Sequence, residues 1–478
     1  MADPGFIGRT AYLRELSARL ALAAGSGGDF VLLRGRRQVG KSRLVTEFLA
    51  RSGARSVYFQ AARRAAREEF ASFTEALGRS NLTGADLVRN GLQFSTWESA
   101  FEWIARTASP DDPVVVVLDE LPYLTGTNPS FESVLQLVWD HTLEGRPVLL
   151  VVVGSDLATM EAVSSYDRPL YGRVRLERVV LPLNLAEVAD VLGLGAPDAV
   201  DAYLTVGGFP RVLLSWARGM SRREFVREGL SDPTSALVVI GERMLAAEFP
   251  DPETARAALE AVGHGERSFS TLSDRSGLSG TSLHRALALL RSKRVIEGED
   301  PLSTARGGRA TRYRVADPYL RFWLRFVGPA LADVERGRAD LAVTRAEDGW
   351  SSYRGRAVEP LVRQSLERLA PVPGLGTARD FGAYWTRAND VEVDLVGVAD
   401  RRRVQHIDAV GSIKWRDGQP FSTADAANLR RAASVVPGVD DTTNLVAVSQ
   451  AVSRSGFVDG LGEVVRLGPG DLLSAWSG

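Results

Sequence analysis

Two glycines, a lysine and a serine lie close together near the start of the chain. Residues 35–42 read GRRQVGKS, which fits the pattern G-x-x-x-x-G-K-S. Because glycines let backbone N–H groups turn inward around phosphate oxygens, this pattern is typical of a loop that binds a nucleoside triphosphate. Lys41 is expected to reach the β- and γ-phosphates, and the Ser42 hydroxyl to ligate Mg²⁺. The residues expected to contact the nucleotide in this segment are Gly35, Arg36, Arg37, Gln38, Val39, Gly40, Lys41, Ser42 and Arg43.

A second set of polar residues follows apolar runs. Residues 113–124 read PVVVVLDELPYL, in which Asp119 and Glu120 end the run. We expect Asp119 to hold the Mg²⁺ shell and Glu120 to activate the attacking water. Ser155 ends a further run, PVLLVVVGSD, where it can sense the γ-phosphate. Arg173, in RPLYGRVRL, could supply transition-state charge as an arginine finger, and a surface salt bridge is the alternative role.

A third set lies towards the C-terminal end. Residues 391–415 read VEVDLVGVADRRRVQHIDAVGSIKW, and we expect Asp394 to end one strand and Lys414 to end the next. Carboxylates that bind Mg²⁺ beside a lysine are typical of metal-dependent nucleases. The position that needs a second carboxylate holds Ser412, whose neutral hydroxyl is a poor Mg²⁺ ligand. We therefore expect a disabled metal site, and a salt bridge between Asp394 and Lys414 is the alternative.

The first two sets need an α/β fold to position them. Residues 30–34 predict a short apolar strand before the glycine-rich loop, and residues 43–50 predict a helix after it. A loop that follows a strand and opens a helix is the context in which this motif binds phosphates. The apolar run before Asp119 fits a buried strand of a parallel sheet that is covered on both faces.

Residues 251–315 predict a winged helix, because helices and a glycine-containing turn are followed by a hairpin with a Gly-Gly turn. Residues 281–315 carry eight basic and three acidic side chains, in a chain whose net charge is −1. This local excess favours contact with DNA phosphates. Docking to a protein is the alternative. The residues expected to contact DNA are Arg285, Arg291, Lys293, Arg306, Arg309 and Arg312.

Several of these segments together resemble a known family. FIGRTAYLREL, GRRQVGKS, VVVVLDELPYL, VVVGSD, PLYGR and VGGFPR, in this order, resemble the archaeal and prokaryotic ATPase family of AAA+/STAND-type P-loop proteins, over about residues 6–215. The resemblance implies that Gly8, Arg9 and Pro210 lie near the adenine. It also implies a helical lid over about residues 182–245.

The C-terminal part resembles a second family. A predicted amphipathic helix with the sequence WSSYRGRAVEPLVRQSLERL carries Glu359, and two predicted strands, FGAYWTRANDVEVDLVGV and RRVQHIDAVGSIKW, follow it. This segment is similar to the DUF234 domain, which is itself similar to the PD-(D/E)xK nucleases. The resemblance maps the nuclease motif to Glu359, Asp394 and Lys414.

The organisation expected from these patterns has four parts: a P-loop ATPase core (1–181), a helical lid (182–248), a winged helix (249–318) and an α/β nuclease-like domain (319–478). Hydrophobic residues make up 45% of the chain and charged residues 24%, as in ordinary globular proteins. No apolar run approaches the roughly 18–20 residues that span a bilayer, and the N-terminus lacks a signal-peptide pattern. The expected location is therefore the cytoplasm. The chain has no cysteine and four histidines, so we expect neither disulfides nor a structural zinc site.

Lysine is scarce in this chain. Of its 58 basic residues 55 are arginine, and the lysines are Lys41, Lys293 and Lys414. A retained lysine hints that a compact ammonium group is required, since a planar guanidinium does not replace it in a tight site. Lys41 and Lys414 fall on the phosphate-binding and nuclease-like motifs, and Lys293 lies in the basic segment expected to contact DNA.

The sequence thus predicts an ATP-binding and ATP-hydrolysing switch, with Mg²⁺ as the second cofactor, that contacts DNA and carries a disabled nuclease-like domain. A second copy of the chain or another protein is a further candidate partner. An active ATP-regulated DNA endonuclease is the first alternative. A signalling scaffold whose winged helix docks protein is the second.

Overall fold

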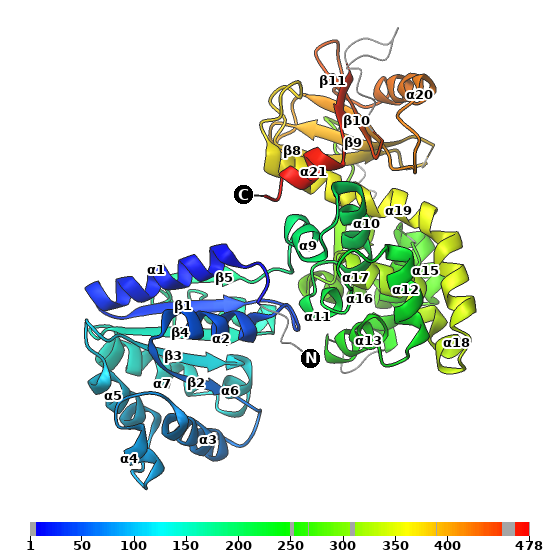
Figure 1. The fold of residues 1–478 in the computed structure, drawn as a ribbon. Helices are drawn as coiled ribbons and strands as arrows, with labels where there is room; N and C mark the ends of the chain where they lie inside the picture. The colour runs from blue at the N-terminus through cyan, green and yellow to red at the C-terminus, as the bar shows by residue number, and fades with distance from the viewer. Residues whose placement is uncertain are drawn as a thin grey trace. The chain divides into compact units, whose positions relative to one another are not determined.

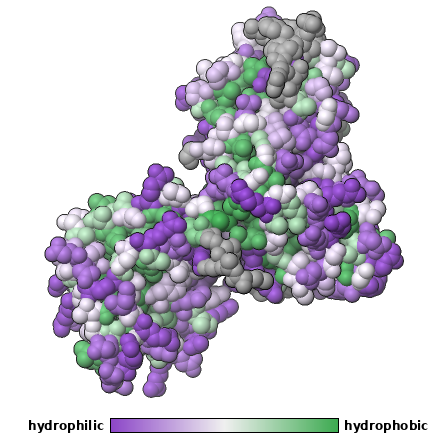
Figure 2. All heavy atoms as spheres, in the orientation of Figure 1, coloured by the Kyte–Doolittle hydropathy of each residue, from purple (hydrophilic) through white to green (hydrophobic). Residues whose placement is uncertain are grey.

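The computed structural model describes residues 6–248, 253–265, 267–305, 311–388, 390–451 and 464–477. Contacts divide the chain into two compact units, Met1–Leu183 and Asn184–Gly478, each with its own sheet and hydrophobic core (Figure 1). Hydrophilic residues cover much of the face of each unit drawn in Figure 2. Within the described ranges, every helix is too short or too polar to cross a membrane.

The first unit is built on a parallel sheet with the strand order β2-β3-β4-β1-β5 in the described part of the chain. The strands are β1 (Asp29–Arg34), β2 (Arg55–Gln60), β3 (Val114–Asp119), β4 (Val148–Gly154) and β5 (Leu176–Val179). All residues of β1, β3 and β4 are buried, because helices cover both faces of the sheet (Figure 1). The buried parallel strands predicted from the valine and leucine runs are confirmed.

Helices of the first unit form a layer on each face of this sheet. α1 (Thr10–Ser26) and α2 (Lys41–Ser52) contact each other on one side. On the other side Phe73, Phe101 and Phe131 join a core with the strands, from α3 (Ala66–Arg79), α5 (Trp97–Thr107) and α7 (Phe131–Val138). The remaining elements are α4 (Ala85–Arg89), α6 (Leu121–Thr127), the π-helix η1 (Trp139–Leu143) and α8 (Leu157–Val163).

The second unit begins with helices, which lie in the segment predicted as a lid. These are α9 (Leu185–Leu192), α10 (Ala196–Val206), α11 (Pro210–Leu213), α12 (Arg222–Ser231) and α13 (Ala236–Glu248). α13 packs on Trp323, whose indole Nε1 donates to the Val238 carbonyl at 2.8 Å. A Cβ at Gly241 would lie 2.4 Å from the Trp323 ring, so this helix pair needs a glycine there.

The helical segment that starts at Pro318 is interrupted. It consists of α17 (Pro318–Phe322), the π-helix η2 (Trp323–Val327) and the 3₁₀-helix η3 (Gly328–Ala330), and α18 (Leu331–Glu335) follows. Asp317 accepts a hydrogen bond from the Leu320 amide at 2.7 Å and thereby starts α17.

The segment predicted as a winged helix has the expected order of elements. α14 (Glu253–Gly263), α15 (Phe269–Ser276) and α16 (Gly280–Ser292) precede an antiparallel pair of strands, β6 (Ile296–Glu299) and β7 (Arg312–Val315). Gly277 ends α15 with φ 67°, a conformation that favours glycine. Leu283, Leu287 and Leu290 of α16 are buried. The predicted Gly-Gly turn lies outside the described residues.

The C-terminal segment carries a second sheet, with the order β12-β11-β10-β9-β8. Its elements are α19 (Ala339–Leu369), β8 (Asp380–Trp385), β9 (Glu392–Val398), β10 (Ala409–Lys414), α20 (Thr423–Ala433), β11 (Asn444–Ser449), β12 (Val464–Leu467) and α21 (Pro469–Ser474). The prediction of one strand over residues 381–398 is wrong, because polar residues from Thr386 turn the chain and β8 pairs antiparallel with β9. Asp394 lies inside β9 and does not end it.

Candidate functional site

The glycine-rich loop lies between β1 and α2 and curls around the ammonium group of Lys41. Lys41 is 6% exposed, and its Nζ donates to the carbonyls of Gly35 at 2.8 Å and Arg36 at 3.0 Å. Gly40 has φ 92°, and a Cβ at Gly35 would lie 2.5 Å from the Val180 carbonyl oxygen. The two glycines of the motif are thus needed for the path of the loop.

Arg9 ties the N-terminal segment to this loop. It is 5% exposed, and its Nη2 donates to the Val39 carbonyl at 2.7 Å while its Nη1 donates to the Leu181 carbonyl. Gly8 and Arg9 both have positive φ, 62° and 64°. Pro210, which the resemblance grouped with them, starts α11 in the second unit.

Asp119 is the centre of a hydrogen-bonded group beside the loop. It is fully buried, and its Oδ2 accepts hydrogen bonds from the Ser42 hydroxyl at 2.7 Å and from the Tyr58 hydroxyl. The structure therefore brings the two predicted metal ligands, Ser42 and Asp119, together. Two adjacent oxygen groups suit Mg²⁺, which prefers oxygen ligands and retains several waters.

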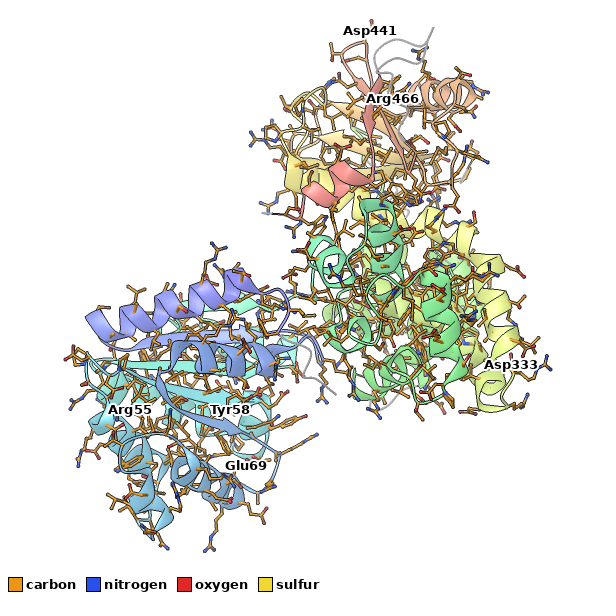
Figure 3. The ribbon with its side chains drawn as sticks, in the orientation of Figure 1. Arg55, Tyr58, Glu69, Asp333, Asp441 and Arg466 are labelled. Carbon is orange, nitrogen blue, oxygen red and sulfur yellow. The ribbon has the colours of Figure 1, made fainter. Side chains whose placement is uncertain are left out.

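The sequence analysis missed Tyr58. Tyr58 lies on β2 (Figure 3), which pairs with β3 through Tyr58 and Val117. Its hydroxyl donates to Asp119, at the carboxyl end of β3. Burial and the neighbouring Asp119 raise the pKa of Tyr58, which keeps the phenol protonated and able to donate. In the sequence, this role is indicated only by a tyrosine, whose ring ends in a hydroxyl, within a short strand.

Glu120 and Ser155 lie together next to this group. The Ser155 hydroxyl donates to Glu120 Oε2 at 2.8 Å, and the Ser155 amide donates to the same oxygen at 3.3 Å. Glu120 has φ 61°, a strained conformation for a residue other than glycine. β3 and β4 are parallel neighbours, so their carboxyl ends bring the predicted base and the predicted phosphate sensor into contact.

Arg173 does not lie with these residues. Its guanidinium forms two hydrogen bonds of 2.7 Å with Asp140, as the salt-bridge alternative describes. The Arg175 amide donates to Phe30 at the start of β1, whereas the loop follows the end of β1, about five residues or 16 Å away. Within one chain Arg173 is at the opposite end of the sheet, so an arginine-finger role would require a site on another chain.

In the second unit, Asp394 is held by the strand beside it. Its Oδ2 accepts hydrogen bonds from the Ser412 hydroxyl at 3.1 Å and the Ile413 amide at 2.9 Å, and Lys414 Nζ lies 3.9 Å away. Asp394, Ser412 and Lys414 are thus close together. Ser412 binds the carboxylate instead of adding a second one.

Glu359, on α19, is surrounded by arginines. Arg363 donates to Glu359 at 3.1 Å, to Glu299 at 2.8 Å and to the Asp394 carbonyl at 3.1 Å. Burial raises the pKa of Glu359, although Arg363 and Arg267 oppose this change. Among the residues that the structure describes, no group of three or more histidine, aspartate and glutamate side chains could hold a metal ion.

The residues predicted to contact DNA differ in exposure. Arg285 and Arg291 are exposed on α16, and Lys293, just after it, is half-buried. Arg306 and Arg309 lie outside the described residues. Arg312 is 13% exposed, forms an ion pair with Glu392 at 2.7 Å and lies over the Trp385 ring. Its guanidinium is thus engaged within the second unit.

Two family models match this chain. Residues 6–215 match a family of ATPase domains found predominantly in Archaea, and residues 323–429 match DUF234, a family of archaeal and bacterial proteins of unknown function. The chain carries an archaeal-type ATPase domain and a DUF234 domain. The ATPase domain contains the Lys41 loop and the Asp119 group, and the DUF234 domain contains Glu359, Asp394 and Lys414.

Similar proteins are known from several archaea. An uncharacterised protein of Methanocaldococcus jannaschii is 22% identical over 418 residues, which are 86% of this chain and 88% of that protein. A Walker-type ATPase of Pyrococcus abyssi is 18% identical, with a TM-score of 0.49 over 67% of this chain and 96% of that one. The ORC2 protein of Aeropyrum pernix is 14% identical, with a TM-score of 0.46 over 70% of this chain and 97% of that one.

Proposed function

We propose that this protein is an ATP-hydrolysing switch that contacts DNA through its winged helix and whose DUF234 domain does not cut DNA. One observation carries the proposal of hydrolysis. Ser42, Asp119, Glu120 and Ser155, which come from three separate segments, form one hydrogen-bonded group beside the glycine-rich loop. Such a group supplies a metal ligand, a base and a phosphate sensor at one end of the sheet.

The residues of this site divide the chemistry of hydrolysis between them. The backbone N–H groups of the loop would bind phosphate oxygens, while Lys41 exchanges its bonds to the loop carbonyls for bonds to the β- and γ-phosphates. Ser42 and Asp119 would hold Mg²⁺, whose contribution when bound is to offset the negative charge that develops on the phosphates. Glu120 would orient the attacking water and accept its proton on a carboxylate oxygen, giving up its bond from Ser155.

Two substitutions test hydrolysis. Lys41→Ala should abolish tight ATP binding, because the phosphates lose their nearest cation. Glu120→Gln should keep ATP binding and slow turnover about 100-fold or more, because only the group that takes the proton is removed. ATP binding by equilibrium dialysis and phosphate release measure the two effects. Glu98→Gln, an exposed change on α5, is the matched control. Turnover by Glu120→Gln at the parent rate would show that the base is assigned wrongly.

The proposal for the DUF234 domain rests on what Glu359 and Asp394 contact. Both carboxylates are engaged by protein donors, Glu359 by Arg363 and Asp394 by Ser412 and the Ile413 amide. A Mg²⁺ ion would have to replace these partners without a further carboxylate at position 412. Binding or scaffolding is therefore favoured over cutting.

Plasmid nicking with Mg²⁺ tests this part of the proposal. The parent protein should show no cleavage above background, and Ser412→Glu should raise metal affinity because it adds a carboxylate about 7 Å along the strand from Lys414. Any cleavage that Ser412→Glu gains should disappear when Lys414→Ala is added. Cleavage by the parent that disappears on Asp394→Ala would instead establish an active nuclease.

A further inference from the structure

A recess in the second unit lies where α14 and β7 meet α19 and the β8–β9 pair. It encloses about 120 Å³. One buried water molecule needs about 10–15 Å³ of such space, so the recess can hold on the order of ten water molecules. Glu359 of the nuclease-like site lines the recess, but the function proposed above places no ligand in this space.

Positive charge predominates in the wall of this recess. Seven arginines line it, against three glutamates. Four of the arginines have acidic partners; Arg363, for example, donates to both oxygens of Glu299 at 2.8 Å. The other three, Arg321, Arg325 and Arg356, have no ion pair in the described part of the chain.

These three guanidinium groups are balanced only weakly by the protein. Arg321 donates to the carbonyls of Val315 at 2.7 Å and Ala357 at 3.3 Å, and Arg325 donates to the His264 carbonyl at 3.2 Å. Burial lowers the pKa of Arg321, and the nearby Arg314 lowers it further. Arg356 forms no hydrogen bond within the described residues. Arg321 is half-buried, so leaving its charge unpaired is costly unless an anion joins it, whereas Arg325 and Arg356 are exposed.

The recess also has apolar walls. Val315, Ala357 and Pro360 line it, together with the rings of Tyr313, Tyr353 and Trp385. A ligand with both an anionic group and a planar or apolar part would therefore fit. The recess, of about 120 Å³, is too small to take a duplex, although Arg325 and Arg356 are exposed. A small molecule suits this recess better than DNA.

We propose that this recess binds a small molecule with a phosphate group, held by Arg321, Arg325 and Arg356. Phosphate has several acceptor oxygens that match guanidinium forks, and it carries more charge than a single carboxylate. The bound molecule would bridge the winged-helix segment, which contributes the β7 wall, and the DUF234 domain, which contributes Arg356. The site is independent of the ATPase loop.

The test uses the full chain with Lys41→Ala, so that the ATPase loop does not contribute. Calorimetric titration with AMP and with pyrophosphate should show saturable binding of at least one of them. Arg356→Ala should weaken that binding about ten-fold or more, since a charge-assisted hydrogen bond to the anion is removed. Arg336→Ala, an exposed arginine near α18, should leave it unchanged. Circular dichroism would verify that each variant is folded.

Four results would overturn the proposal. One is the absence of saturable binding by AMP, pyrophosphate and inorganic phosphate. Another is binding of citrate as tightly as the phosphate compounds, which would reject phosphate as the recognised group. The third is binding of duplex DNA that Arg356→Ala weakens while AMP and pyrophosphate do not bind, which would assign the recess to nucleic acid. Retention of AMP affinity in an Arg321→Met and Arg356→Ala double variant would also contradict the site.

Discussion

One carboxylate oxygen of Asp119 accepts hydrogen bonds from two hydroxyl groups. Ser42 comes from the loop and Tyr58 from β2, so a strand outside the recognised motifs helps to hold the predicted metal ligand. Groups that hydrogen-bond a metal ligand orient it, and their removal typically lowers metal affinity or activity 10- to 100-fold. Tyr58 is thus a positioning residue for Asp119.

Tyr58→Phe should raise the Mg²⁺ concentration for half-maximal ATPase activity about ten-fold, because the ring remains and only the donor to Asp119 is removed. Unfolding free energy should fall by roughly 1–3 kcal/mol, the cost of removing a hydrogen bond to a charged group. Mg²⁺ titrations of turnover and urea unfolding measure these effects. Tyr166→Phe, at a residue 84% exposed, is the control. An unchanged Mg²⁺ dependence would reduce Tyr58 to a packing role.

Glu359 gives a second prediction at the level of one side chain, for the pH dependence of stability. Burial raises its pKa above the ordinary value of 4.5. The folded chain then binds this proton more tightly than the unfolded chain, so the contribution of Glu359 is fully present below the unfolded pKa and is lost as pH rises through the folded pKa. Glu359→Gln cannot ionise and should not show this loss.

Urea unfolding of the parent and of Glu359→Gln, from about pH 4 to pH 8, measures the difference. The parent should lose more stability than the variant as the pH rises through this range. Glu367→Gln, on the same helix, should follow the parent. A variant less stable than the parent by the same amount at every pH would mean that an uncharged contact of Glu359, and not its ionisation, dominates.

Among the secondary-structure elements, α16 shows how one helix serves the core and the surface. Leu283, Leu287 and Leu290 face inward at helical spacing, while Arg285 and Arg291 are exposed. The strand pair β6–β7 offers DNA less positive charge than the sequence suggested, because Arg312 forms an ion pair with Glu392. Any contact of this segment with DNA should therefore depend strongly on α16.

Replacing Arg285 and Arg291 by alanine should weaken duplex DNA binding for all sequences alike. The slope of log K against log salt should flatten by up to about 0.9 for each phosphate that the protein no longer neutralises. Fluorescence anisotropy at several salt concentrations measures both quantities, with Arg336→Ala as the control. If affinity and slope stay at the parent values, docking to a protein becomes the preferred role for this segment.

In the molecule as a whole, the ATPase match and the compact units do not share a boundary. The match runs to residue 215, whereas the first unit ends at Leu183. The last helices of the matched segment are anchored in the second unit: Arg354 of α19 bonds Asp201 of α10 at 2.9 Å, and the Tyr353 hydroxyl donates to the Leu204 carbonyl at 3.0 Å. A change in these helices on ATP binding would therefore act directly on α19, which carries Glu359.

The local elements and the glycine-rich loop could be predicted from the sequence. The run before Asp119 and the glycines around Lys41 specify a buried strand and a phosphate-binding turn through short-range sterics and hydrophobicity, and the order of the α14–β7 segment followed from helical spacing and turn residues. Helix α19 was likewise predictable around Glu359, although its start at Ala339 was not.

Which side chains meet depended on the tertiary structure. Strand order placed Tyr58 beside Asp119 and Ser155 beside Glu120, and it left Arg173 at the far end of the sheet. Of the two arginines beside Glu359, Arg363 lies four residues along the same helix, whereas Arg267 comes from a segment far away in the chain. A local pattern fixes the face of a strand or helix on which a residue lies, but its neighbours depend on non-local packing, which no short stretch of sequence contains.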